Sequence, residues 1–300
     1  MSHTPAAQGW PPLQIPIVDL VAGSCAGAAQ VIVGQPLDTV KTRAQTSTQF
    51  KGPLEIFVRT LKDEGALAFF KGMASPLLGV AAQNSLLFTA FALAKRTVSP
   101  STQELSVAQV AAAGSIAGVV NSVLASPVEL FKIRMQAQYG SPADRKLSQV
   151  AKDLWSQHGF KRGVMRGFWV TVAREAPAYA GFYAGFEAAK RTFRTRLYPD
   201  LPKDQMLPLW CLMASGSTGG ICNWLACYPL DVIKSKVQLS NYPLRGWGPT
   251  YIATEFQTIA RQEGYRAFLR GLSPTLLRSI PAAAATFTVY ELTLTALTKA

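Results

Sequence analysis

The sequence has few of the residues from which enzyme active sites and metal centres are built. It contains two histidines and four cysteines, with no Cys-x-x-Cys pair and no histidine at metal-ligand spacing from a cysteine. Both histidines, His3 and His158, lie outside the apolar segments described below, so an enzyme embedded in a membrane would have no histidine to use. We therefore expect no metal ion, no cofactor and no enzymatic activity.

Charged residues are also scarce, at 16% of the 300 residues, whereas roughly a quarter is typical of soluble domains. Hydrophobic residues account for 49%, which favours a membrane protein. The net charge is +13, but Lys and Arg are scattered without a dense basic run, which argues against a nucleic-acid interface. Because the first Lys or Arg is Lys41, neither a signal peptide nor an Arg-rich transit peptide fits the N-terminal segment. Any organelle address should therefore be internal.

Long charge-free stretches predict membrane spans. Four of them contain 18, 23, 24 and 26 residues, close to the roughly 20 that cross a bilayer. Two further apolar segments, 168–193 and 273–297, are interrupted by Arg174 with Glu175 and by Arg278. The sequence thus predicts six spans, two of which carry charge.

One string, Pro-x-acid-x-x-base-x-base-x-Gln, occurs three times, starting at Pro36, Pro127 and Pro229. The starts lie 91 and 102 residues apart, which indicates repeats of about 100 residues within one domain, 1–300. We place the repeats at about 16–98, 104–194 and 206–298. A glycine pair with four-residue spacing precedes each proline, and such pairs let membrane helices approach closely. The pairs are Gly23/Gly27, Gly114/Gly118 and Gly216/Gly220.

Each repeat also has a second shared element, an acid-Gly pair followed by a base-Gly pair. The middle copy departs, with His158 in place of the acid and one extra residue before its last glycine. Between the two elements, a polar and partly amphipathic segment predicts a short helix on the membrane surface. We interpret the departure of the middle copy as drift in a loop.

The tripled string with its second element resembles the signature of the mitochondrial carrier family over about residues 16–298. The resemblance implies an all-α membrane protein in which six transmembrane helices, in three pseudo-symmetric repeats, surround a central cavity, with short matrix-side surface helices. It also implies a monomer in the mitochondrial inner membrane that moves a metabolite by alternating access. The three loops assigned to the matrix contain 14 Lys or Arg against 7 Asp or Glu, in agreement with the positive-inside rule. Anionic cardiolipin is implied at the starts of the even helices, at Lys71-Gly72, Arg166-Gly167 and Arg270-Gly271.

Charges inside a membrane are costly unless they are paired, so three acids and three bases at equivalent positions predict a ring in which the repeats neutralise one another. The alternative is that these charges merely cap helices at the membrane surface. The resemblance implies that the ring is a matrix gate, braced by the glutamines of the string. The implied pairs are Asp38 with Lys132, Glu129 with Lys234 and Asp231 with Lys41, and the braces are Gln45, Gln136 and Gln238.

The family's opposite, outer gate uses an aromatic-acid-x-x-base motif on each even helix. Only the middle copy is complete here, because Ala92 and Leu294 replace an acid and a base. At most two ion pairs can then form, so we expect the outer side to open more easily. The charged residues available to this gate are Lys95, Glu187, Lys190 and Glu291.

The resemblance places substrate contacts 12 or 13 residues before the outer motif, at mid-membrane depth. Arg174 could bind a carboxylate and Glu175 an ammonium group, which suits a zwitterion. A purely structural Arg174-Glu175 contact is the alternative. The remaining candidate contacts are Arg278, Gly79 and Asn84.

We expect the substrate to be a zwitterionic amino acid or a carnitine-type compound. Because Gly79 and its neighbour supply no acid, basic amino acids are less favoured than neutral or acidic ones. Two alternatives remain: a carboxylate or keto-acid carrier, which Glu175 disfavours, and a carrier-fold protein that transports nothing.

Overall fold

The structure is a computed structural model that describes residues 17–47, 49–99, 105–139, 146–202, 205–240 and 248–299. The expected repeat starts at 16 and 104 lie outside the described residues. Every regular element in the described part of the chain is helical, as the sequence predicts.

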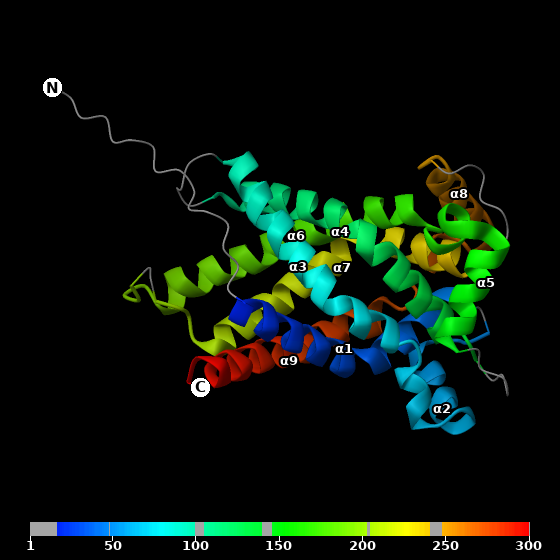
Figure 1. The fold of residues 1–300 in the computed structure, drawn as a ribbon, viewed down its shortest axis with the longest axis horizontal. Coiled ribbons are helices and arrows are strands. Elements are labelled where there is room, and N and C mark those ends of the chain that lie inside the picture. Colours follow the sequence, from blue (N-terminus) through cyan, green and yellow to red (C-terminus); the bar gives the residue numbers. More distant parts are fainter. Residues whose placement is uncertain are drawn as a thin grey trace.

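Six long helices run along the longest axis of the molecule (Figure 1). Each packs against the next in the order of the chain, and the last packs against the first, so they form a closed helix ring. The first and last members lie side by side in Figure 1 although they are far apart in the sequence. The six are α1 (Ile17–Thr46), α3 (Ala74–Val98), α4 (Val107–Gln136), α6 (Phe168–Leu197), α7 (Leu209–Leu239) and α9 (Leu272–Lys299).

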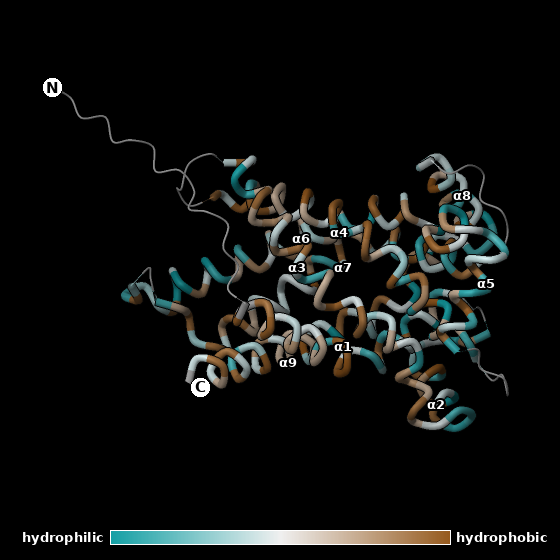
Figure 2. The backbone as a smooth tube through the Cα atoms, viewed as in Figure 1, coloured by the Kyte–Doolittle hydropathy of each residue, from teal (hydrophilic) through white to brown (hydrophobic). Residues whose placement is uncertain are grey.

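Apolar residues cover much of the length of these helices, whereas polar residues gather near the ends of the molecule (Figure 2). By length and composition, α1, α3, α4 and α9 can each cross a membrane. The helices α6 and α7 are as long but less apolar, because α6 carries Arg174 and Glu175, and α7 is rich in Gly, Ser and Thr. Both are members of the same closed ring. A charged or small-residue face is therefore compatible with a transmembrane position.

Three short helices gather at one end of the molecule (Figure 1). They are α2 (Pro53–Asp63), α5 (Leu147–Gly159) and α8 (Tyr251–Glu263), and each is followed by a single tight turn, η1 (Ala66–Phe70), η2 (Phe160–Val164) or η3 (Tyr265–Leu269). Each packs against the preceding long helix of its own repeat through a small apolar cluster. A glycine with positive φ then turns the chain into the even helix, at Gly72, Gly167 and Gly271.

The middle repeat accommodates its extra residue by a change of turn type. Whereas η1 and η3 are 3-10 turns, η2 is a π-helical turn, closed by a hydrogen bond from Met165 N to Phe160 O of 2.9 Å. A wider turn takes up one more residue per hydrogen bond. A Cβ on Gly163 would lie 2.3 Å from Leu154 O, so the turn needs glycine there. The extra residue is thus built into the fold and is not loop drift.

The glycine pairs of the odd helices lie at helix contacts, but not all of them are equally close. A Cβ on Gly114 of α4 would lie 2.8 Å from the carbonyl oxygen of Tyr179 in α6, and one on Gly118 would lie 2.7 Å from that of Glu175. At Gly23 of α1, the position equivalent to Gly114, a Cβ would meet only the Phe88 ring at 3.7 Å. Close backbone approach is therefore required in the second repeat but not at Gly23.

Gly114→Ala should destabilise the protein by about 1 to 3 kcal/mol, because the added methyl group forces α4 and α6 apart. Gly23→Ala is the matched control and should be neutral or slightly stabilising, since Ala is the better helix former by about 1 kcal/mol. The measurement is the thermal unfolding midpoint of the purified protein in detergent. Equal midpoints for the two variants would contradict the close α4–α6 contact.

Candidate functional site

The six charges that the sequence analysis assigns to a matrix gate lie together near the C-terminal ends of α1, α4 and α7, and we keep the name matrix gate for this set. Lys132 Nζ lies 2.5 Å from Asp38 Oδ2, and Lys41 Nζ lies 2.7 Å from Asp231 Oδ2. Lys234 contacts Glu129. Each pair joins two different repeats, so the three predicted pairs form a ring through the bundle.

Four of these six charges are buried, whereas Glu129 and Lys132 are partly exposed, with side-chain exposures of 30% and 18%. The burial of the four argues against the interpretation that the charges merely cap helices at the surface. Asp38 is 6% exposed, Asp231 4% and Lys234 1%. Removing one member of a buried pair leaves the other charge without compensation, which costs about 3 to 5 kcal/mol. The pairs therefore stabilise the contact between the odd helices.

Only one of the three predicted braces binds an ion pair. Gln45 Nε2 donates to Asp231 Oδ2 at 2.9 Å and to the Tyr228 hydroxyl at 3.2 Å. Gln136 instead accepts a hydrogen bond from Thr42, at 2.8 Å, and donates one to Thr39. The amide of Gln238 donates to the carbonyl of Ser126. Gln136 and Gln238 thus join neighbouring repeats without touching a gate charge.

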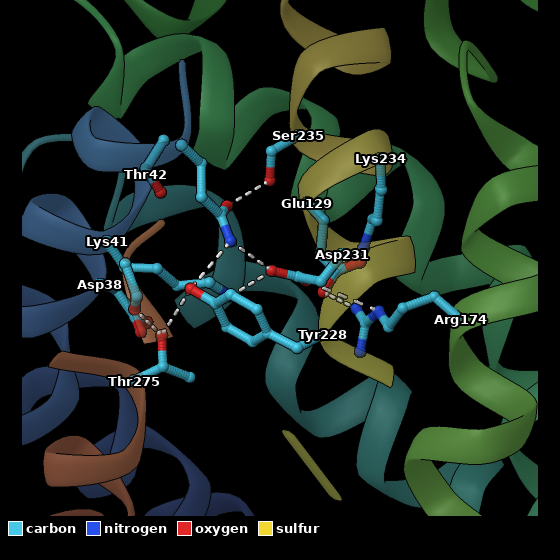
Figure 3. Close-up of polar contacts among 12 residues, drawn as sticks. Asp38, Lys41, Thr42, Glu129, Arg174, Tyr228, Asp231, Lys234, Ser235 and Thr275 are labelled. Carbon is cyan, nitrogen blue, oxygen red and sulfur yellow. Dashed lines mark hydrogen bonds and ion pairs between the residues drawn. The ribbon is translucent and has the colours of Figure 1, made fainter. Parts of the chain in front are cut away.

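Sequence reasoning missed Tyr228, which connects the gate to α9. Its hydroxyl accepts from Gln45 and donates to Arg270 O, just before α9, at 2.8 Å. It also lies 3.5 Å from Thr275 Oγ1 of α9 (Figure 3). The nearby Trp224 ring lies 3.9 Å from Lys41 Nζ, so that lysine is held by a carboxylate and an aromatic face. A signal was present, because Tyr228 directly precedes Pro229, where the other repeats have Gln35 and Ser126.

Arg174 and Glu175 of α6 lie directly above the gate. Arg174 Nη2 lies 2.6 Å from Glu129 Oε1 and 2.8 Å from Glu175 Oε1, and its Nε lies 3.9 Å from Asp231 (Figure 3). Both residues are buried, with exposures of 6% and 2%. Arg174 thus lies between Glu175, its neighbour in the sequence, and two acids of the gate.

Arg278 of α9 occupies the equivalent place in the third repeat. Its Nε lies 2.7 Å from Asp38 Oδ1, the carboxylate that Lys132 also binds. A Cβ on Gly34 of α1 would lie 2.5 Å from that same nitrogen, so the guanidinium group fits only because residue 34 is glycine.

The two arginines lie near the N-terminal ends of their helices. Each is the seventh residue of its helix, about 9 Å from the start at 1.5 Å per residue. Helical side chains point toward the N-terminus, which carries both guanidinium groups onto the gate acids. The candidate substrate site and the matrix gate are therefore in direct contact.

Gly79 and Asn84 of the first repeat lie at helix contacts. A Cβ on Gly79 would lie 2.8 Å from Val128 of α4, and Asn84 Nδ2 donates to Gly23 O of α1 at 3.1 Å. These contacts give both residues a packing role, which for Asn84 is the alternative to a substrate contact that its sequence position leaves open. The charged part of the site comes from the second and third repeats alone.

The outer motif shows a different arrangement. Glu187 binds Lys190 and Arg191 of its own helix, at 3.6 and 2.7 Å. Among the described residues, no ion pair within 4.0 Å joins Lys95 or Glu291 to another repeat. Lys95 Nζ lies 5.0 Å from the Phe91 ring, which stacks on Tyr183 of α6. The structure thus has its cross-repeat ion pairs formed on the matrix side and not in the outer motif.

A closed ring of six membrane helices, with paired charges at one end and further charges directly above them, defines a membrane carrier. The sequence model described as mitochondrial carrier protein matches residues 14–102, 103–197 and 205–300. The chain belongs to the mitochondrial carrier family. It is a metabolite transporter of the mitochondrial inner membrane.

Similar proteins match over nearly the whole chain. Mitochondrial substrate carrier family protein S of Dictyostelium discoideum is 39% identical and covers 91% of this chain and 95% of its own length. The mitochondrial basic amino acids transporter of Homo sapiens is 37% identical, with 93% and 90% covered. The glutamate/glycine mitochondrial carrier ymc1 of Schizosaccharomyces pombe is 36% identical, with 91% and 92% covered.

Lys41→Ala should lower stability by about 3 kcal/mol, because the buried Asp231 would lose its close cation and keep only Arg174, at 3.9 Å. Lys190→Ala is the comparison, since this side chain is 39% exposed and pairs only within its helix, so that its loss should cost about 1 kcal/mol or less. Thermal unfolding of the two purified variants measures the difference. A Lys41→Ala midpoint no lower than that of Lys190→Ala would contradict a buried gate.

Proposed function

We propose that the protein carries an amino acid, recognised as a zwitterion by Arg174 and Glu175. The observation that supports this most is a pair of buried opposite charges, 2.8 Å apart, above the closed matrix gate. The guanidinium group can hold a carboxylate through parallel charge-assisted hydrogen bonds, and the carboxylate can accept from an ammonium group. A substrate with both groups satisfies both residues at once.

The relatives support an amino acid over the other candidates. Two of the three reported relatives are named for amino acids, and these names differ in the charge of the side chain. What they share is the α-ammonium and α-carboxylate groups. A carnitine-type compound also combines a cation and a carboxylate, but no reported relative is named for one. A simple dicarboxylate would face repulsion from Glu175, which disfavours the carboxylate carrier.

Alternating access follows from the two gates. With the matrix pairs formed and the outer motif without cross-repeat pairs, the substrate enters from the intermembrane space. Its carboxylate competes with Glu129 for Arg174, because that arginine already binds the gate acid. Binding thereby weakens a contact of the closed matrix side, which supplies the free-energy difference that a change of state requires.

We also propose that the carrier acts as a monomer that binds cardiolipin where α3, α6 and α9 begin. The first amides of α3 and α6 have no side-chain cap, and uncapped helix N-termini attract phosphate. The adjacent cations have protein partners, since Lys71 contacts Glu64, Arg166 donates to Val237 O, and Arg270 contacts Glu263. The lipid phosphate would therefore bind mainly the backbone amides.

Glu175→Gln should reduce amino-acid uptake into liposomes, and stabilisation of the protein by the amino acid, by at least about tenfold, because the ammonium group loses a charged acceptor. Glu55→Gln, on the surface helix α2, is the matched control and should behave as wild type. The screen covers amino acids, carnitine esters and carboxylates by thermal shift, followed by uptake. Stabilisation by carboxylates alone, unchanged in Glu175→Gln, would favour the carboxylate carrier. No response to any compound would favour a protein that does not transport.

Restoring the outer motif with Ala92→Asp and Leu294→Lys should favour the state that is closed to the outside. Each exposed pair contributes about 1 kcal/mol or less, so the two populations should shift by at most about thirtyfold. The exchange rate and the outside labelling of a cysteine placed inside the helix ring are the measurements. The neutral variant Ala92→Asn with Leu294→Gln should not shift either one. An unchanged rate and sidedness in the charged variant would show that these positions do not limit opening.

A further inference from the structure

The charges inside the helix ring do not balance. The nine charged groups of this site, which are the six gate charges with Arg174, Glu175 and Arg278, comprise five cations and four carboxylates. The second bases of the tripled string are not part of this set, because Arg43 binds Glu64, Lys236 binds Glu263 and Arg134 donates to Gln238 O. The matrix gate is neutral as a set, and Arg174 has Glu175 as its own counter-charge. One positive charge therefore remains, and it belongs to Arg278.

The contacts of Arg278 support this assignment. Its single ion pair within 4.0 Å, among the described residues, is with Asp38, which already has Lys132 at 2.5 Å. The Arg278 Nε–H makes no hydrogen bond of good geometry in the described structure, despite lying 2.7 Å from Asp38 Oδ1. Two cations thus share one carboxylate, while the buried guanidinium donor has capacity for another acceptor.

The guanidinium group is also held in a fixed place. Its position over Gly34 depends on the missing Cβ of that residue, and the side chain is 15% exposed, twice the 7% of Arg174. An excess cation that is positioned by packing and partly exposed fits a recognition role. In the first repeat, Gly79 and Val80 provide no acid that would offset it.

We propose that the substrate is an acidic amino acid whose side-chain carboxylate binds Arg278 while its α-ammonium and α-carboxylate groups bind Glu175 and Arg174. This inference rests on the proposed function and adds the side chain to it. An acidic amino acid carries one net negative charge, which brings the occupied interior to neutrality. A neutral amino acid leaves one positive charge buried, and a basic one leaves two, which a membrane interior disfavours.

The test uses homo-exchange in liposomes, in which the same compound is inside and outside, so that no counter-substrate has to be known. Aspartate and glutamate are compared with their neutral isosteres asparagine and glutamine and with ornithine. Wild type should exchange at least one acid about tenfold faster than its isostere at equal low concentration, because a charge-assisted contact is replaced by a neutral one.

Two substitutions isolate Arg278. Arg278→Gln should reduce the ratio of acid to isostere to about one while exchange of the isostere persists, and Arg278→Lys should retain the preference because the charge remains. Gly34→Ala should act like Arg278→Gln, since the added methyl group displaces the guanidinium group, whereas Gly23→Ala should have no effect. Asp38 keeps Lys132 in all of these variants, so the gate pair is preserved.

The outcomes separate the two proposals. Faster exchange of a neutral or basic amino acid by wild type overturns the acidic substrate and leaves the amino-acid carrier standing. An unchanged ratio in Arg278→Gln also overturns the role of this arginine. If none of the five compounds is exchanged and only other classes stabilise the protein, the proposed function fails and this inference fails with it. If a variant does not fold, thermal stabilisation of the wild type by the acid and by its neutral isostere provides the same comparison.

Discussion

A charge within a membrane has to be neutralised by the protein itself, and in this carrier each of the six gate charges has its partner in another repeat. Lys132 binds Asp38, Lys234 binds Glu129 and Lys41 binds Asp231, so no repeat can bury its own charges alone. Other features of the helix ring serve this contact. Close-packed glycines bring α4 and α6 together. Gln45 donates to both Asp231 and Tyr228, and the Tyr228 hydroxyl lies 3.5 Å from Thr275 of α9.

A second set of charges connects the gate helices to the surface helices, and the sequence analysis did not foresee this connection. Arg43, two residues after Lys41, binds Glu64 at 2.6 Å, and the same acid contacts Lys71. The third repeat has the same arrangement, with Glu263 between Lys236 and Arg270. In both repeats, the second base of the tripled string is thus linked to the base of the base-Gly pair, because both bind the acid of the acid-Gly pair. Motion at the gate would be transmitted to the start of the following even helix.

Patterns that repeat could be predicted from the sequence, because three copies at matched offsets specify both the partners and their register. The six long helices, the surface helices and the three gate pairs are of this kind. Features that depend on one repeat could not be predicted. The role of Gln136 depends on Thr39 and Thr42 of α1, and the π-helical turn at Phe160–Val164 depends on Gly163 packing against Leu154. The contacts of Arg174 and Arg278 with the gate acids depend on where α6 and α9 begin, which residue counting did not specify.

Threefold symmetry and substrate selection place opposite demands on the same interior. A symmetric ring of three acids and three bases is neutral and has no preference for one orientation of a small asymmetric molecule. Selection needs residues that break the symmetry, and these are concentrated on α6 and α9, while α3 contributes an uncharged contact at Gly79. Because Arg174 and Arg278 each touch a gate acid of another helix, the groups that would distinguish a substrate are the same groups that help to hold the matrix gate closed. Substrate binding and gate opening would then occur together, because carboxylates of the substrate replace carboxylates of the gate on Arg174 and Arg278. No coupling over a distance is needed.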